Sequence, residues 1–259
     1  MDYKYLEAYY NKFCEDKRLL SRHGQVEFLT TIRYIEKYIN GDLNKKIFDD
    51  GAGTGRYSLY FKDKGYDVTS IELIKNNLGV LKSKSKDIKA YLGNALDLSR
   101  FKEEYDIVLI FGPMYHLFSL EEKKKVLQEA YKITKKNGYI FISYILEDYA
   151  ILKHGFIDNN IVSSIKDDKV DDNFKIHHSE KDIYDYVSLD EINNIATFDG
   201  LKRVQIIAQD GPTDFFRKEI NNMSDDVFKL YLKYHFSRCE KKELLGASSH
   251  VLDILQKIK

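Results

Sequence analysis

A run of closely spaced glycines follows a short apolar segment near position 50. The run is Gly51-Ala52-Gly53-Thr54-Gly55; Asp49-Asp50 precede it and Arg56 follows it. Glycine is required where the backbone adopts a positive φ or approaches a ligand closely. A helix that starts after such a loop presents unpaired backbone N–H groups. The segment therefore predicts a strand, a tight turn and a helix, with room for a nucleotide-like ligand against the turn.

The spacing of these glycines limits which ligand the loop can bind. A dinucleotide-binding loop has glycine at its first, third and sixth positions, and the sixth position counted from Gly51 is Arg56. A phosphate-binding loop of the Walker type needs Gly-Lys followed by Ser or Thr, which this segment lacks. The carboxylate of Asp49 suits a cationic ligand better than a pyrophosphate. An NAD-dependent oxidoreductase is therefore disfavoured.

Two further segments carry side chains suited to the same ligand. Glu72 ends a predicted strand over residues 66–71, where a carboxylate can accept both hydroxyls of a ribose; the alternative is a solvated glutamate at a strand end. Asn94 and the N–H of Ala95 follow the next predicted strand and can contact the edge of an adenine-like ring. Asn94 can equally form a turn, and Asp97 is as suited to capping a short helical turn as to touching a ligand.

Alternating strands and helices must position these loops. The apolar periodicity predicts strands over 46–49, 66–71, 88–92, 105–111 and 139–145, and helices over 57–64, 75–85 and 120–134. Ser119 is placed to cap the last of these helices, and Asn137-Gly138 is placed to turn the chain into the strand after it. This order predicts an α/β fold, a parallel sheet with helices on both faces.

The remaining segments extend this core within a single domain over 1–259. Helices over 3–13 and 25–39 form an N-terminal helical cap (1–40), and the cofactor-binding core spans 41–146. Residues 147–187 are polar and read as an insertion or lid. The C-terminal part (188–259) contains a helix over 188–197 capped by Ser188, a strand over 201–208, a helical insertion over 213–242 with a long helix over 224–240, and a final strand over 249–258.

Composition excludes several classes of protein. Lys plus Arg and Asp plus Glu both number 41, so a nucleic-acid partner is disfavoured. The N-terminus has no apolar signal segment and no window approaches 18 apolar residues, which makes the cytoplasm the expected compartment and excludes a membrane span. Cys14 and Cys239 lie far apart in sequence, which does not indicate a disulfide, and two thiols without the histidine spacing of a zinc site give no reason to expect a metal.

The sequence resembles the class I S-adenosylmethionine-dependent methyltransferases. The resemblance covers residues 47–145 and rests on 49–56, Glu72, 94–97 and 105–117. A weaker similarity to a group of bacterial small-molecule methyltransferases extends over most of the chain. Its segments are 112–117 after the fourth strand, 239–250 near the end, and 18–19 with 25–28 near the start.

The resemblance implies a fold, a cofactor and an activity. The fold is a Rossmann-like, doubly wound, seven-stranded and mostly parallel sheet, whose last strand, about 251–256, runs antiparallel between its neighbours. The cofactor is S-adenosyl-L-methionine, which carries an ammonium and a sulfonium and no phosphate, and the acceptor is a small molecule. The expected cofactor-binding residues are Asp49, Gly51, Ala52, Gly53, Gly55, Arg56, Glu72, Leu73, Asn94, Ala95 and Phe111.

One residue departs from the pattern of the family. Asp50 stands where the family usually has an aliphatic side chain. A second carboxylate at the edge of a buried strand is costly unless it is paired or hydrated. Asp50 therefore either faces the cofactor cleft or exchanges roles with Asp49.

Methyl transfer from a sulfonium is an in-line displacement, so the enzyme must align the reactants and exclude water. The candidates for catalysis, Tyr115 and His116, follow the fourth strand at the ligand-binding edge of the sheet. His116 could act as a base or donate to a carbonyl, and Tyr115 could pack over the cofactor. Tyr3, Tyr9 and Tyr10 could form a lid or the packing face of a helix.

Other histidines give weaker signals. His235 and Arg238 share one helix face, and a solvated edge is the favoured interpretation of both. His177-His178 lack useful spacing for a metal.

Two alternatives to a small-molecule methyltransferase remain. A nucleic-acid amino-methyltransferase carries Asn/Asp-Pro-Pro-Tyr/Phe after the fourth strand. The segment Gly112-Pro113-Met114-Tyr115 shares only one proline and the tyrosine with this motif. A nucleic-acid or protein substrate is therefore the second choice. A non-catalytic module that binds S-adenosylmethionine is the other alternative, with Asp50 as its only indication.

Overall fold

The computed structural model of the chain describes residues 3–12, 19–179 and 181–259. Phe13, Cys14 and Arg18, which entered the sequence predictions, lie outside these ranges. Among the described residues, no helix combines the length and the apolar character needed to cross a bilayer.

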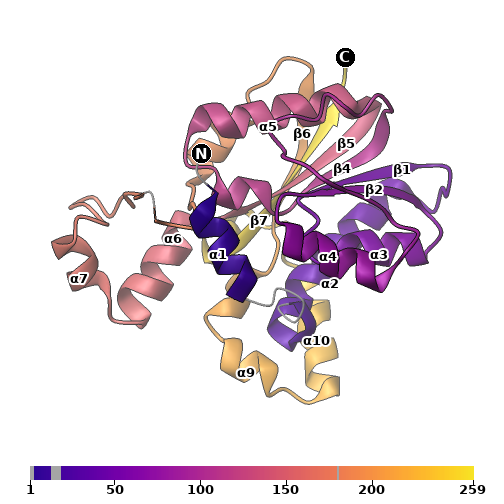
Figure 1. Cartoon of the computed structure of the whole chain (residues 1–259). Helices are drawn as coiled ribbons and strands as arrows, with labels where there is room; N and C mark the ends of the chain where they lie inside the picture. Colours follow the sequence, from indigo (N-terminus) through magenta and orange to yellow (C-terminus); the bar gives the residue numbers. More distant parts are fainter. Residues whose placement is uncertain (1–2, 13–18, 180) are drawn as a thin grey trace.

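The centre of the molecule is a seven-stranded sheet with the strand order β3-β2-β1-β4-β5-β7-β6 (Figure 1). The first five strands of this order are parallel, and β7 runs antiparallel to both of its neighbours. This confirms the predicted fold class, including the reversed last strand. The strands are β1 (Lys46–Asp50), β2 (Asp67–Glu72), β3 (Lys89–Leu92), β4 (Tyr105–Ile110), β5 (Thr134–Ile145), β6 (Leu201–Ala208) and β7 (His250–Lys257).

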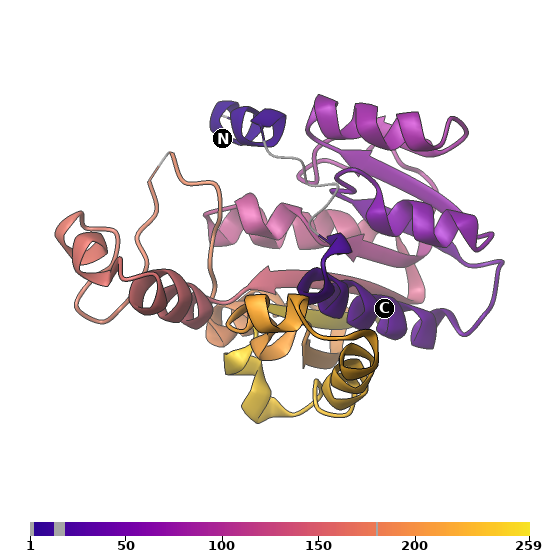
Figure 2. The ribbon, with the colours of Figure 1, turned by 90° about the horizontal axis from the view of Figure 1, so that it is seen from below.

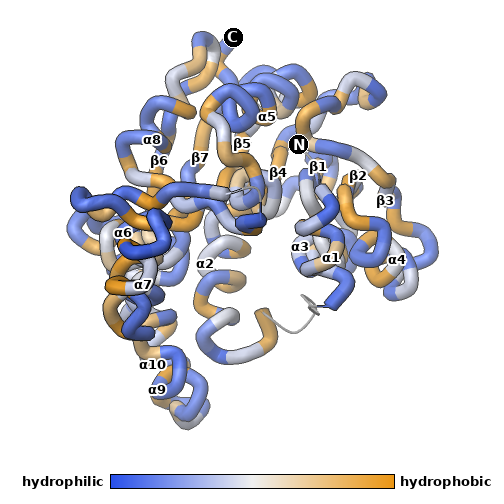
Figure 3. Tube along the Cα trace, turned by 60° about the vertical axis from the view of Figure 1, so that its left-hand side comes forward, coloured by the Kyte–Doolittle hydropathy of each residue, from blue (hydrophilic) through white to orange (hydrophobic). Residues whose placement is uncertain are grey.

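Helices cover both faces of this sheet because the central strands are apolar on both sides. One layer contains α2 (Arg22–Ile39) and α3 (Arg56–Asp63), whose buried side chains form a cluster with Ile107 and Leu109 of β4. The other contains α5 (Leu120–Ile133) and α8 (Leu189–Ile195), which pack on the alternate residues of the same strands. Figure 3 shows the hydrophobic stretches concentrated along the strands between these layers. A fully buried aliphatic side chain contributes about 1.5–3 kcal/mol.

Two predicted helix starts are confirmed by their caps. The hydroxyl of Ser119 accepts a hydrogen bond from the backbone N–H of Glu122 at the start of α5. Ser188 and Glu191 form a complete capping box at the start of α8. These caps satisfy backbone N–H groups in the first turn of each helix, and they fix the residue at which each helix begins.

Two segments extend beyond the layered core. The first is α1 (Lys4–Lys12), which lies apart from the sheet in Figures 1 and 2. The second leaves the end of β5 as α6 (Glu147–Ala150), a π-helical turn (Ile151–Ile157) and α7 (Ile161–Lys166), and it projects from the body of the molecule. The helix α4 (Lys75–Lys84) follows β2 as predicted.

Asn137-Gly138 lie inside the bounds of β5, with Asn137 in the left-handed region (φ 66°), and the regular pairing of β5 with β4 and β7 begins at Tyr139, as predicted. Two local predictions are wrong. The long helix expected over 224–240 ends early, as α10 (Asp225–Phe236), and a short helix α9 (Arg217–Asn221) precedes it. His235 is buried on α10 rather than solvated, whereas Arg238 is exposed.

Candidate active site

A cavity of about 750 Å³ lies at the carboxyl edge of the parallel strands. It is lined by the loops after β1, β2, β3 and β4, by residues of α1 and α2, and by two C-terminal segments, around 210–217 and 249–250. This size is typical of pockets that bind drug-sized ligands. Open α/β sheets bind ligands at this edge, where the strand order reverses, here between β1 and β4.

The glycine loop forms one wall of the cavity, and its three glycines have different roles. All three have positive φ angles: 79° at Gly51, 57° at Gly53 and 89° at Gly55. A Cβ on Gly51 would lie 2.5 Å from Cδ of Pro113. A Cβ on Gly55 would lie 2.1 Å from Leu81, so this glycine allows α3 and α4 to pack. A Cβ on Gly53 would meet no atom within 4 Å, because this residue faces open space in the cavity.

Glu72 holds the glycine loop in place from the end of β2. Its carboxylate accepts hydrogen bonds from the backbone N–H of Gly53 at 2.7 Å and of Ile74 at 2.8 Å. Burial raises the pKa of Glu72, and these backbone hydrogen bonds oppose that rise. Each carboxylate oxygen has a second lone pair, so the group can still accept hydroxyl donors from the cavity that it lines.

The two neighbouring aspartates at the end of β1 differ in their partners. Asp49 accepts a hydrogen bond from the hydroxyl of Ser58 at 2.5 Å, and burial raises its pKa to about 6. Asp50 is fully buried, and neither of its carboxyl oxygens has a hydrogen-bond partner among the described residues. Burial first, and then the charges of Asp49 and Glu72, raise the pKa of Asp50 well above its ordinary value. Asp50 is among the residues at the cavity wall, but its side chain has no exposed surface, so the carboxyl lies beneath that wall in the ligand-free chain.

The loop after β3 is held by its own asparagine. The carbonyl oxygen of the Asn94 side chain accepts from the backbone N–H of Leu96 at 3.0 Å, and its amide donates to the hydroxyl of Tyr3 at 3.0 Å. Asn94 thus forms a turn and also connects α1 to the cavity wall. Asp97 accepts from the backbone N–H of Ser99, which caps the next turn.

The structure brings the other predicted cofactor residues to the same cavity, with one exception. Ala52, Arg56, Leu73, Ala95 and Phe111 all line it. Gly55 is not among the described lining residues, because it faces α4.

Tyr115 and His116 lie on a 3₁₀ turn (Pro113–His116) after β4, and both line the cavity. The hydroxyl of Tyr115 donates to Ser143 at 2.5 Å, and Ser143 donates to Gln209 at 2.5 Å. Nδ1 of His116 donates to the carbonyl oxygen of Ile183 at 2.7 Å. Burial lowers the pKa of His116 to about 4, so the imidazole is neutral and weakly basic at pH 7.

Aromatic residues from distant segments close the cavity over His116. The hydroxyl of Tyr10 lies 3.0 Å from Nε2 of His116, and the ring of Tyr184 is 5.5 Å from its ring. The hydroxyl of Tyr184 donates to that of Tyr9 at 3.1 Å. Tyr3, Tyr9 and Tyr10 all line the cavity, so α1 covers the site.

A cluster of charged residues at the far end of the cavity was missed by the sequence analysis. It comprises Glu27 on α2, Asp210 after β6 and His250 at the start of β7. The signal was present: because β7 was expected to run antiparallel, its first residue had to lie at the same edge as the carboxyl ends of the parallel strands. His250 indeed pairs with Ile145, the last residue of β5.

The other histidines considered in the sequence lie elsewhere. His235 packs behind Gly211, whose Cβ would lie 3.2 Å from its Nδ1. His177 is half-exposed in the insertion. Nε2 of His178 lies 2.9 Å from Asp185, which also forms a buried ion pair with Lys123.

The chain resembles known methyltransferases over its core. Residues 48–142 match the model of a family described as a methyltransferase domain. A glycine/sarcosine N-methyltransferase of Aphanothece halophytica is 28% identical over 118 residues, which cover 43% of this chain and 44% of that protein. A demethylmenaquinone methyltransferase of Renibacterium salmoninarum is 32% identical over 100 residues, covering 38% and 40%. The chain therefore spans less than half the length of these curated relatives.

Solved structures share the fold over most of the chain. A crystal structure of an S-adenosylmethionine-dependent methyltransferase from Methanosarcina mazei aligns over 87% of this chain and 97% of that one, with a TM-score of 0.56 and 14% identity. The sheet order and this alignment show that the chain shares the fold of that methyltransferase. The family match over residues 48–142 falls on the segment from β1 to β5, which contains the glycine loop.

Proposed function

We propose that this protein binds S-adenosylmethionine in the cavity at the carboxyl edge of its sheet and transfers the methyl group to a small-molecule acceptor. One observation carries the proposal: the carboxyl of Asp50 is fully buried beneath the wall of the cavity and has no partner among the described residues. A buried carboxyl of this kind costs free energy unless a donor or a cation meets it. The ammonium of S-adenosylmethionine is such a cation, whereas NAD would add phosphates to the same carboxylates.

The residues around Asp50 fit the rest of this cofactor. Glu72, fixed by two backbone N–H groups, is suited to accept ribose hydroxyls, and the loop of Asn94 and Ala95 is suited to the adenine. Gly53 leaves the space that the cofactor requires next to the loop. When bound, S-adenosylmethionine supplies a methyl group that is attached to a sulfonium. After the transfer, the sulfur is a neutral thioether.

The acceptor is proposed to be a small molecule because the cavity is covered. Tyr3 just before α1, Tyr9 and Tyr10 of α1, and Tyr184 of the insertion close the space above the strand ends. A covered cavity excludes water, as methyl transfer requires. The relatives named above methylate glycine or sarcosine and demethylmenaquinone by name, which supports the same class of acceptor. The zero net charge gives no support to a nucleic-acid substrate.

Calorimetry with S-adenosylmethionine and S-adenosylhomocysteine tests this proposal. We expect both to bind in a one-to-one complex, and NADH to produce no heat of binding. Absence of binding by both sulfur compounds would overturn the proposal. Binding without turnover on a panel of amines, quinols and carboxylates would instead favour a non-catalytic module.

A further inference from the structure

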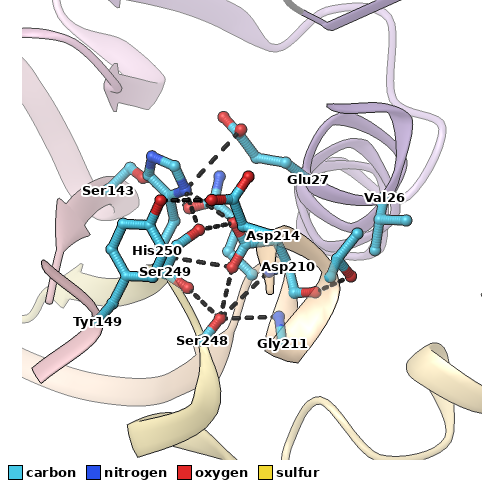
Figure 4. A network of polar contacts seen from close by, with 12 residues as sticks. Val26, Glu27, Ser143, Tyr149, Asp210, Gly211, Asp214, Ser248, Ser249 and His250 are labelled. Atoms are coloured by element: carbon cyan, nitrogen blue, oxygen red, sulfur yellow. Dashed lines mark hydrogen bonds and ion pairs between the residues drawn. The ribbon is translucent and has the colours of Figure 1, made fainter. Parts of the chain in front are cut away.

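Three ionisable side chains meet at the end of the cavity that the proposed cofactor residues do not occupy. Glu27, Asp210 and His250 come from α2, from the loop after β6 and from the start of β7 (Figure 4). Their potential ligand atoms all lie within 4.8 Å of one another. The glycine loop follows β1, and the strands β4 and β5 lie between β1 and β7 in the sheet. Where S-adenosylmethionine binds at the loop, this cluster faces the space left for the acceptor.

Asp210 is fixed by four donors. Its Oδ1 accepts from the hydroxyl of Ser248 at 2.7 Å and from the backbone N–H of His250 at 2.9 Å. Its Oδ2 accepts from the hydroxyl of Ser249 and from Nδ1 of His250 at 2.8 Å. Burial alone would raise the pKa of Asp210, but the charge and hydrogen bonds of His250, together with the Ser249 hydroxyl, lower it to about 2. Asp210 is therefore an anion at neutral pH.

This geometry selects one tautomer of His250. An anionic carboxylate can only accept, so the hydrogen on the imidazole lies on Nδ1, and Nε2 is the basic nitrogen. Figure 4 shows the other ring nitrogen on the side turned away from Asp210. The ring lines the cavity, 5.8 Å from the ring of Tyr115. An aspartate that holds histidine by Nδ1 in this way orients a general base and stabilises the imidazolium that forms.

Glu27 adds a second negative charge beside the ring. Its Oε2 lies 3.9 Å from Nδ1 of His250, and its side chain is almost fully buried. A carboxylate at this distance stabilises the positive charge that the imidazole gains when it accepts a proton.

A divalent metal fits this cluster less well than the hydrogen bond between His250 and Asp210 does. The four lone pairs of Asp210 already accept four N–H or O–H donors, so a metal would have to displace the Nδ1 hydrogen bond and leave a serine or backbone donor unpaired. Metal ligation of a histidine is usually accompanied by a hydrogen bond from its other nitrogen. Here the hydrogen bond already joins two of the three supposed ligands.

We propose that His250, positioned by Asp210, accepts the proton that the acceptor's nucleophile loses during methyl transfer, so that the acceptor presents an amine or a hydroxyl to this end of the cavity. The inference rests on the proposed function. The lone pair of the nucleophile forms the new bond to the methyl carbon, and the carbon–sulfur bond breaks with its electron pair going to sulfur. The proton passes to Nε2 of His250. His250 is thus a catalytic residue, and Asp210 is a positioning residue.

A ¹⁵N NMR measurement on the ligand-free protein tests the inference without an acceptor. Long-range ¹H–¹⁵N spectra above the imidazole titration distinguish the two neutral tautomers of His250. We expect the Nδ1–H tautomer in the wild type, and loss of that preference in Asp210→Asn. An Nε2–H tautomer in the wild type, or no change in Asp210→Asn, would overturn the inference. A shift of the His250 signals on addition of Zn²⁺ alone at stoichiometric concentration would also overturn it, in favour of a metal site.

Turnover and binding provide the second test. In His250→Gln we expect S-adenosylhomocysteine affinity within about twofold of wild type, and methyl transfer to amine and quinol acceptors to fall by about 10²–10⁴-fold. His177→Gln, a half-exposed histidine of the insertion, is the matched control and should change neither quantity. Wild-type turnover that persists in His250→Gln contradicts the inference alone. Absence of S-adenosylhomocysteine binding by the wild type instead contradicts the proposed function.

Discussion

The carboxylate of Asp210 accepts a hydrogen bond from Nδ1 of His250 at 2.8 Å, although the two residues are forty positions apart. The antiparallel β7 brings them together, because its second residue, Val251, pairs with Ala208 at the end of β6. One edge of the sheet therefore holds the glycine loop at one side and a carboxylate–imidazole pair at the other. A cofactor and an acceptor require such a two-ended site.

The first prediction concerns Gly53 in the glycine loop. Gly53→Ala places a methyl group in the ligand space, and no protein atom lies within 4 Å of it. We expect the variant to fold with a loss of about 1–2 kcal/mol in stability from its positive φ. We also expect its affinity for S-adenosylhomocysteine to fall by at least tenfold. Thermal unfolding and calorimetry measure the two effects.

Gly41→Ala is the matched control for this variant. Gly41 also has a positive φ (70°) and open space around its Cβ, but it lies in the turn between α2 and β1 and does not line the cavity. It should lose similar stability and bind normally. Equal binding by both variants would show that the cofactor does not lie against Gly53.

The second prediction concerns the unpartnered carboxyl of Asp50. Asp50→Val replaces a buried acid with an apolar group of similar size, so we expect the ligand-free protein to gain about 1–3 kcal/mol in stability at pH 7. Affinity for S-adenosylmethionine should fall, because the ammonium loses its acceptor. A variant that is less stable, or that binds the cofactor as tightly as wild type, would contradict the proposed contact.

The pH dependence of this difference has a definite sign. The pKa of Asp50 in the folded chain lies well above the ordinary value of 3.8, so the folded chain keeps a proton that the unfolded chain loses as the pH rises past about 4. The stability of the wild type relative to Asp50→Val is therefore greatest at acid pH and declines as the pH rises. Urea unfolding of both proteins at pH 4, 6 and 8 measures this trend. A gap that stays constant with pH would mean that Asp50 is ionised in the fold.

The third prediction concerns Glu72, which receives the N–H groups of Gly53 and Ile74. In Glu72→Gln the amide NH₂ replaces one acceptor oxygen, so one backbone N–H loses its partner and the charge-assisted bonds to the ribose weaken. We expect affinity for S-adenosylhomocysteine to fall by about 10- to 100-fold, corresponding to 1.5–3 kcal/mol for hydrogen bonds to a charged group. Glu103→Gln, an exposed carboxylate paired with Lys46, is the control and should bind normally. Equal loss in both variants would indicate a general electrostatic effect rather than a contact.

The fold, and the position of the glycine loop and Glu72 at one edge of the sheet, could be predicted from sequence because both depend on local patterns. The apolar run 107–111 reads as a buried parallel strand, and Gly51, Gly53 and Glu72 follow strand ends at fixed spacing. The turn at Asn137-Gly138 is local as well: Asn137 adopts the left-handed conformation, and the regular pairing of β5 begins at Tyr139.

The acceptor side depends on contacts that spacing does not encode. Glu27 reads as one polar position of an amphipathic helix, and Asp210 as a loop residue before Gly211. Only the pairing of β7 with β5 and β6 brings His250 to these two carboxylates. The side-chain environment of His116 was equally hidden, because Tyr10 and Ile183 approach it from segments distant in sequence.

The fourth prediction decides whether His116 can serve as the base. Burial lowers its pKa to about 4, so an NMR titration of the histidine signals should place its midpoint near pH 4. Because the folded pKa lies below the ordinary 6.5, His116 contributes stability that is present above pH 6.5 and is lost as the pH falls towards 4. His116→Asn should lack this acid-dependent loss. A midpoint near 6.5 would restore His116 as a candidate base at neutral pH.

The fifth prediction concerns the buried ion pair that anchors the chain beside Tyr115. Lys123 of α5 pairs with Asp185, and the backbone N–H of Asp185 donates to the carbonyl oxygen of Tyr115 at 2.7 Å. Lys123→Met leaves the buried carboxylate of Asp185 with His178 as its remaining ion-pair partner among the described residues, so we expect a loss of about 3 kcal/mol.

The double variant Lys123→Met/Asp185→Leu distinguishes the stability lost by breaking this ion pair from the stability lost through changed packing. Both charges are then replaced by apolar groups, so we expect most of the lost stability to return in chemical unfolding, because no unpaired charge remains buried. The substitutions lie behind Tyr115 rather than in the glycine loop, so affinity for S-adenosylhomocysteine should stay within about threefold of wild type, about 0.7 kcal/mol. A double variant less stable than Lys123→Met would show that Asp185 acts through its backbone contact with Tyr115 and through His178, and not through the lysine.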